Sequence, residues 1–289
     1  MKYITKERKS NNIITTKSNT FLSFLYNTLL GRIILKLFIS KPFSKIIGLY
    51  LSSKLSTIRI KRFIKKNNIN IKEYENKKYT SFNDFFIRKI KEENRPLNKS
   101  KNIFISPCDS KLTVYKINKD LTVKIKDSYY TIDTLVNKDI MKEYINGYML
   151  VFRLEPTDYH RYCYIDNGMQ EENIHINGVL HTVQMISLNK YNFYKTNDRE
   201  YTILHTENYN DIVHIEIGAM IVGKIHNLHE NYNFKKGEEK GYFEFGGSTI
   251  CLLVKPNIIN IDKDILENSK NNIETIVHYR EKIATKKEN

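Results

Sequence analysis

The chain has 289 residues, 40% of them hydrophobic and 27% charged, which is enough for a folded core and excludes a disordered polypeptide. The excess of Lys and Arg gives a net charge of +15, which favours a polyanionic partner, either nucleic acid or an anionic lipid surface. Three widely spaced cysteines (Cys108, Cys163 and Cys251) argue against a disulfide framework or a cysteine-based zinc site and favour a reducing cytosolic environment.

The N-terminal segment is apolar from residue 21 to residue 55, but lysines and arginines interrupt it regularly. The residues at helical spacing are Phe21, Leu25, Leu29, Ile33 and Leu37. Pro42 is expected to end this helix, and a second helix is expected over 43–51. No stretch reaches the ~18 uncharged apolar residues of a spanning helix, and no cleavable secretory signal is evident.

An apolar stripe mixed with cations is typical of helices that lie in a lipid interface. The alternative is that these helices pack on the main domain with their lysines in water. The basic run between residues 59 and 66 could contact phosphates or form a solvated face. We interpret residues 1–78 as a basic amphipathic helical region that associates with a membrane, on the cytoplasmic face and as a peripheral protein.

The body of the chain shows short segments rich in β-branched and aromatic residues, separated by turn-like clusters. The expected strands are 112–117, 121–125, 148–154, 201–206, 212–217 and 249–254. In one of them Val213, Ile215 and Ile217 alternate with polar residues, as in a half-buried strand. The sequence therefore predicts an α+β protein. Helices come first, a mainly antiparallel sheet or barrel-like catalytic body follows within 79–289, and one helix is expected in 262–282.

The segment Gly246-Gly247-Ser248-Thr249 carries the strongest chemical signal. Alone, it most often marks a tight turn that leads into a strand. A serine after glycine can, however, attack the preceding carbonyl, and the resulting ester can eliminate to dehydroalanine and hydrolyse to an N-terminal pyruvoyl group. Such a carbonyl can condense with a substrate amine and accept electrons during decarboxylation.

Four blocks in one order resemble the phosphatidylserine decarboxylase family. The blocks are Phe85-Phe86-Ile87-Arg88 through Arg95-Pro96-Leu97, Ser106-Pro107-Cys108-Asp109, Asp158-Tyr159-His160-Arg161, and Gly237 to Thr249. The segment from Ile217 to Gly223 matches the strand that the family places before the last block. The resemblance spans about residues 80–255.

The resemblance implies a role for each matching residue. Ser248 becomes the pyruvoyl group after cleavage of the Gly247–Ser248 bond, and Asp109 is the carboxylate that polarises the base of self-cleavage. His160 performs acid/base work on the substrate. Taken alone, Asp109 would be read as a turn residue and His160 as a structural histidine.

Two residues depart from the family pattern. Cys163 stands where the family has a second histidine, and Ser110 stands where a glycine is common. A cysteine is a poor substitute for an imidazole base. His160 itself or His181 could serve instead. The other histidines, His278 among them, show no spacing that indicates a metal site or pairing with glutamate, and no metal is expected.

These observations predict a pyruvoyl-dependent carboxy-lyase that converts phosphatidylserine in an anionic membrane to phosphatidylethanolamine and CO2. Its two cleavage fragments, 1–247 and 248–289, are expected to stay together as a heterodimer. One alternative is a non-catalytic basic lipid-binding homologue that does not process itself; another is a pyruvoyl enzyme for a soluble amino acid. No nucleic-acid partner is expected, because no recognition helix or aromatic stacking platform stands out.

Overall fold

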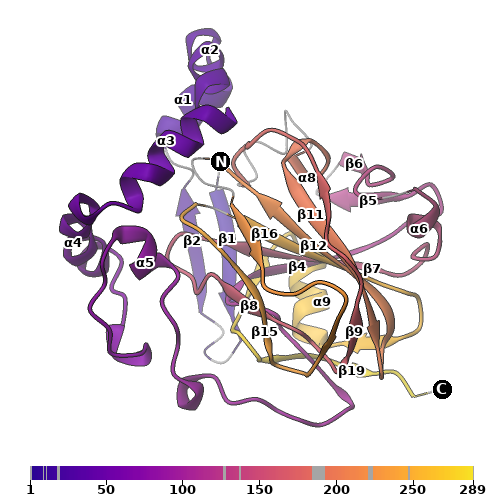
Figure 1. Cartoon of the computed structure of the whole chain (residues 1–289). Coiled ribbons are helices and arrows are strands. Elements are labelled where there is room, and N and C mark those ends of the chain that lie inside the picture. The colour runs from indigo at the N-terminus through magenta and orange to yellow at the C-terminus, as the bar shows by residue number, and fades with distance from the viewer. Residues whose placement is uncertain are drawn as a thin grey trace.

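The computed structural model describes residues 2–8, 10, 12–17, 20–125, 128–136, 138–183, 193–220, 224–246 and 248–288. Figure 1 shows a β-rich body with the N-terminal helices projecting from one side of it. The predicted α+β fold with N-terminal helices is confirmed.

A large sheet of eleven described strands forms the centre of the body. Along the sheet the strands are β14 (Tyr232–Phe234), β9 (Gly168–Gln170), β11 (Arg199–Thr206), β12 (Asn210–Gly218), β16 (Ser248–Val254), β7 (Tyr148–Leu154), β4 (Ser110–Lys116), β18 (Glu274–Val277), β1 (Lys2–Glu7) and β2 (Ile13–Lys17), and β10 (Ile174–Ile176) also pairs with β11. Strands β1 and β18 run parallel, whereas the other pairs are antiparallel.

Smaller sheets and short helices complete the body. The smaller sheets are β13 (Ile225–Asn227), β15 (Glu239–Phe243) and β8 (Arg161–Cys163); β17 (Ile259–Ile261), β19 (Lys282–Lys286) and β3 (Ile103–Ile105); and β5 (Thr122–Ile125) with β6 (Ser128–Thr131). The helices of the body are α5 (Phe82–Phe86), α6 (Lys138–Lys142), α8 (Phe193–Thr196) and α9 (Lys263–Lys270), with 3₁₀ turns η2 (Ile71–Glu73) and η3 (Glu92–Asn94).

The sheet is buried on both faces. Residues of one face belong to a core with Leu150, Phe152 and Leu252, and those of the other face to a core with Val151 and Leu253. The prediction of a half-buried strand over 212–217 is therefore wrong in one respect, because its polar residues His214 and Glu216 are also fully buried. They are tolerated because Glu216 forms an ion pair with the buried Lys240, and burying a charge is costly unless it is paired.

The N-terminal helices are α1 (Thr20–Asn27), α2 (Leu29–Phe38), α3 (Lys41–Leu51), the 3₁₀ turn η1 (Lys54–Thr57) and α4 (Ile58–Lys66). The first predicted helix is broken at Thr28, whose side chain caps α2. Pro42 does not end this helix. It lies in the first turn of α3, where its missing N–H costs no hydrogen bond.

No single described helix is long and apolar enough to cross a membrane, although α1 and α2 together reach that length and composition with a bend of 105° between them. The first strands, β1 and β2, extend the large sheet, so the segment before Thr20 belongs with the body. The division at residue 78 stays a prediction. Near the C-terminus, one helix was predicted within 262–282. The structure has α9 there, at Lys263–Lys270, and the strands β18 and β19 follow it.

Candidate active site

Three of the predicted site residues lie at one edge of the large sheet. Ser248 is the first residue of β16 and lies opposite Gly218 of β12 and Leu154 of β7. Strand β4 runs parallel to β16 and starts directly after Asp109, at the same edge. The loop that follows β7 carries His160. The sheet register thus brings together residues that are far apart in the chain.

Ser248 is buried, with 1% of its surface exposed, and its Oγ has no hydrogen-bond partner among the described residues. Gly246, two residues earlier, has φ 151°, a conformation that favours glycine. Gly247 itself lies outside the described residues. A buried hydroxyl without a partner is costly in a protein interior, and here it coincides with the serine of the predicted cleavage site.

His160 is also completely buried and has one free ring nitrogen. Its Nδ1 lies 2.9 Å from the carbonyl oxygen of Asp158, which can only accept, so Nδ1 carries the proton. Nε2 has no partner in the described part of the chain and is the basic nitrogen. Burial lowers the pKa of His160 to about 3, although the Asp158 carbonyl and the Gly246 backbone beside the ring oppose this shift. The imidazole is therefore neutral at neutral pH.

The first block contacts the second and third blocks. The ring of Phe86 packs on that of His160 with centroids 4.0 Å apart. Arg88 donates to the carbonyl oxygen of Thr157 at 3.4 Å, and Arg95 binds Asp109. The first block thus packs directly against the loop that carries His160 and against Asp109.

Asp109 has partners that the sequence did not indicate. Arg95 donates to both carboxylate oxygens, at 3.0 and 3.3 Å, and the backbone N–H of Tyr279 donates to Oδ1 at 2.6 Å. The ring of His278 lies 3.8 Å away. Burial favours the neutral acid, but hydrogen bonding with His278 and the charge of Arg95 outweigh it and hold the pKa of Asp109 well below its usual range. Asp109 is thus an anion tied to the C-terminal segment.

Cys163, which stands at the position of the missing histidine, lies in surroundings that disfavour its thiolate. It lies at the end of β8, fully buried, and its backbone N–H donates to the carbonyl oxygen of Pro107 at 3.0 Å. Burial raises the pKa of its thiol to about 12, although the nearby Arg280 opposes the shift. At neutral pH the side chain is a protonated thiol and cannot take up a proton.

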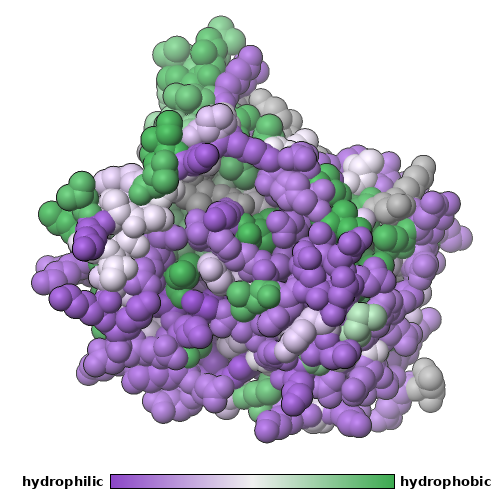
Figure 2. Space-filling model, in the orientation of Figure 1, coloured by the Kyte–Doolittle hydropathy of each residue, from purple (hydrophilic) through white to green (hydrophobic). Residues whose placement is uncertain are grey.

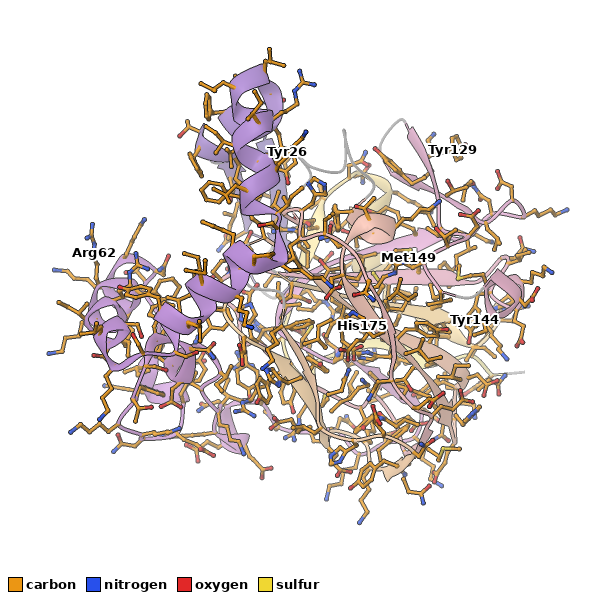
Figure 3. All side chains as sticks on the ribbon, turned by 45° about the horizontal axis from the view of Figure 1, so that its top comes forward. Tyr26, Arg62, Tyr129, Tyr144, Met149 and His175 are labelled. Atoms are coloured by element: carbon orange, nitrogen blue, oxygen red, sulfur yellow. The ribbon has the colours of Figure 1, made fainter. Side chains whose placement is uncertain are left out.

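His181 lies close to the sheet edge, but its ring faces the N-terminal helices. The side chain of Asn197 binds the carbonyl oxygens of His181 and of Gly218, the residue opposite Ser248. The Nδ1 of His181 lies 3.1 Å from the hydroxyl of Tyr26 in α1, which is labelled in Figure 3. Burial lowers the pKa of His181 to about 4. Its ring therefore lies on the side of the sheet edge that faces α1.

The described residues include no group of three or more His, Cys, Asp or Glu side chains arranged to hold a metal ion. Ser248 and His160 both present unpaired polar atoms at the same sheet edge.

Comparison with known proteins links this site to one family. Residues 82–285 match the family model described as phosphatidylserine decarboxylase. Phosphatidylserine decarboxylase proenzyme 2 of Clostridium acetobutylicum is 52% identical over 92% of each chain. The phosphatidylserine decarboxylase proenzymes of Clostridium botulinum strain Langeland and Clostridium novyi are 42% and 39% identical over 99% of this chain and 100% and 99% of their own.

Proposed function

Because the chain belongs to the phosphatidylserine decarboxylase family and is therefore a carboxy-lyase, we propose that it converts phosphatidylserine to phosphatidylethanolamine and CO2. The finer part of the proposal is that its cofactor is a pyruvoyl group made from Ser248. The observation that carries it is the pair of buried, unpaired polar atoms, Ser248 Oγ and His160 Nε2, at one sheet edge.

The residues around position 248 fit such a group. It would stand at the start of β16, shielded from water, beside the loop that carries the neutral His160. A pyruvoyl carbonyl supplies an electrophile for an amine and an electron sink for loss of a carboxylate. The part left to the chain is to exclude water and to move a proton at His160 Nε2, which burial keeps in its basic form.

Self-cleavage needs a base that removes the proton from the hydroxyl of Ser248. In the proposed step, His160 Nε2 takes the proton of Ser248 Oγ, Oγ bonds to the Gly247 carbonyl carbon, and the Gly247–Ser248 C–N bond breaks as the amine takes up a proton. The ester then loses the Ser248 α-proton and the Gly247 carboxylate leaves. Water hydrolyses the resulting dehydroalanine with release of ammonia, and residue 248 becomes pyruvoyl.

We assign the base to His160 in preference to Cys163 or His181. The Cys163 thiol has a pKa of about 12, and the whole His181 ring lies against Tyr26 of α1 and the residues of α2, on the side of the N-terminal helices. The resemblance implies that Asp109 polarises the base. In the described part of the chain, however, its partners are Arg95, the backbone of Tyr279 and His278, so we propose that Asp109 acts as a positioning residue for the sheet edge.

The exposed apolar surface of the N-terminal helices supports a lipid substrate. Leu29, Leu30 and Ile33 of α2 are 61–73% exposed, and Figure 2 shows hydrophobic residues gathered on the projecting helices. Large exposed apolar surfaces of this kind support a peripheral membrane location. The three cysteines are free, which agrees with the reducing cytoplasmic face.

Intact mass spectrometry of the purified protein tests the proposal, together with an assay of CO2 release from phosphatidylserine. We expect fragments 1–247 and 248–289, the second with a pyruvoyl N-terminus. The S248A variant is expected to remain uncut and inactive. The matched control is S110A, because Ser110 is another buried serine at the same edge with an unpaired Oγ, and it should still cleave. An uncut wild-type chain that decarboxylates phosphatidylserine would contradict the pyruvoyl mechanism.

A further inference from the structure

A second feature of the helical region is a cationic pocket between α3, α4, α5 and the segment before β16. Its cavity volume is about 660 Å³, within the range of small-molecule sites. The residues that line it are Tyr50, Ile58, Arg59, Arg62, Phe63, Lys66, Phe82 and Phe245. It therefore combines aromatic walls with three cations.

All charged side chains that line this pocket are positively charged. Arg59, Arg62 and Lys66 follow one face of α4, and the lining contains no carboxylate. Within the described residues none of the three forms an ion pair, whereas the neighbouring cavity beside α3 contains the paired Lys41 and Asp198. Figure 3 shows Arg62 on the helical flank, on the opposite side of the molecule from Tyr144. Arginine side chains bind phosphate through fixed pairs of N–H groups, so the site suits a phosphate.

The pocket shares a wall with the candidate active site. Phe245, three residues before Ser248, contacts Phe82 and Phe86 with ring centroids 5.1 and 4.9 Å apart. Phe86 packs in turn on His160. One aromatic cluster thus lies between the cations and the buried edge, while Ile58 on the rim is 82% exposed.

We propose that this pocket binds the phosphodiester of a phospholipid headgroup. The inference rests on the proposed function and adds the subsite that holds the phosphate of its substrate. Arg59 and Arg62 would hold the phosphate, the amino-acid end of the headgroup would extend past Phe245 toward residue 248, and the acyl chains would leave over the exposed apolar rim. The chemistry is shared by a lipid headgroup and a free phosphate, so the test separates them.

The two faces of α4 supply a matched pair of variants. R59Q/R62Q removes two charges from the pocket, and K61Q/K65Q removes two from exposed positions of the same helix that do not line it. We expect R59Q/R62Q to cleave itself normally but to raise KM for phosphatidylserine in mixed micelles about tenfold or more, the loss expected for charged hydrogen bonds, with kcat nearly unchanged. K61Q/K65Q should match the wild type.

Binding of short-chain phosphatidylserine to the uncut S248A protein, measured by calorimetry, gives a readout without catalysis. Loss of binding in S248A/R59Q/R62Q alone supports the subsite. Equal losses with K61Q/K65Q would mean general surface electrostatics and would overturn it, as would a wild-type KM in R59Q/R62Q. If inorganic phosphate binds as tightly as the short-chain lipid, the site is one for free phosphate. Wild-type CO2 release reports separately on the proposed function.

Discussion

Burial keeps His160 neutral, and the nearby positive charges of Arg88 and Lys111 lower its pKa further. Its pKa of about 3 lies below that of an ordinary imidazole, so its basic form persists through the mildly acidic range. An unfolded chain binds a proton at this histidine below about pH 6.5, whereas the folded chain does not until about pH 3. The contribution of His160 to stability is therefore present at neutral pH and is lost as the pH falls between these two values.

The base assignment predicts a distinctive pH profile for self-cleavage. With His160 as the base, the rate should stay nearly flat from about pH 5 to 8, and H160A should slow it by about 100-fold or more. C163A should cleave at the wild-type rate. Gel densitometry of freshly refolded precursor measures these rates. A rate that rises steadily with pH and disappears in C163A would instead identify the thiolate as the base.

The partners of Asp109 are an example of contacts that could not be predicted from the sequence. The four blocks led to the prediction of Ser248, His160 and Asp109 as site residues, because their types and order are visible in the chain. His278 was passed over, because the contact with Asp109 arises only when β18 pairs with β4 and its end reaches the same edge. Likewise, the burial that makes Cys163 a poor base depends on packing that no local pattern contains.

Some strands and helices could likewise be predicted from the sequence, and others could not. Alternating and β-branched segments predicted β4, β5, β7, β11, β12 and β16, because strands carry a period of two. Strands β1, β2, β18 and β19 were missed. Of these, β1 and β18 pair with each other from opposite ends of the chain, β18 also pairs with β4, and β19 pairs with β3, so these pairings leave no local signal. Pro42 was placed at the wrong end of a helix, because proline suits the first turn as well as the region after a helix.

Helix α2 presents an apolar face without a partner among the described residues, and this yields a prediction for membrane binding. L30E places a charge on a side chain that is 61% exposed and should weaken sedimentation with anionic vesicles about tenfold or more, since burial of a leucine contributes about 1.5–3 kcal/mol. Y129E is the control, with 64% exposure on β6, away from the helices. Equal binding by the wild type and L30E would contradict the interfacial role of α2.

At the scale of the whole molecule, the proposed cleavage falls inside the central sheet. The fragment 248–289 supplies β16, which lies between β12 and β7, and β18, which lies between β4 and β1. Arg153 pairs with Glu274 across the cut chain, and Arg8 pairs with Asp262, Asp264 and Glu281. Strands from both fragments therefore share one hydrophobic core, and neither fragment can bury its own apolar surface alone.

This arrangement predicts that the cut protein behaves as one folding unit. The fragments should co-elute in size-exclusion chromatography at the volume of uncut S248A, and they should separate only at the urea concentration that unfolds the sheet. The physical reason is that removing β16 would expose two unpaired strand edges and both faces of a buried strand. Circular dichroism and intact mass spectrometry of the same fractions measure unfolding and fragment loss together. Release of 248–289 in native buffer, with the remaining sheet intact, would show that the small fragment is an appendage and would contradict the shared core.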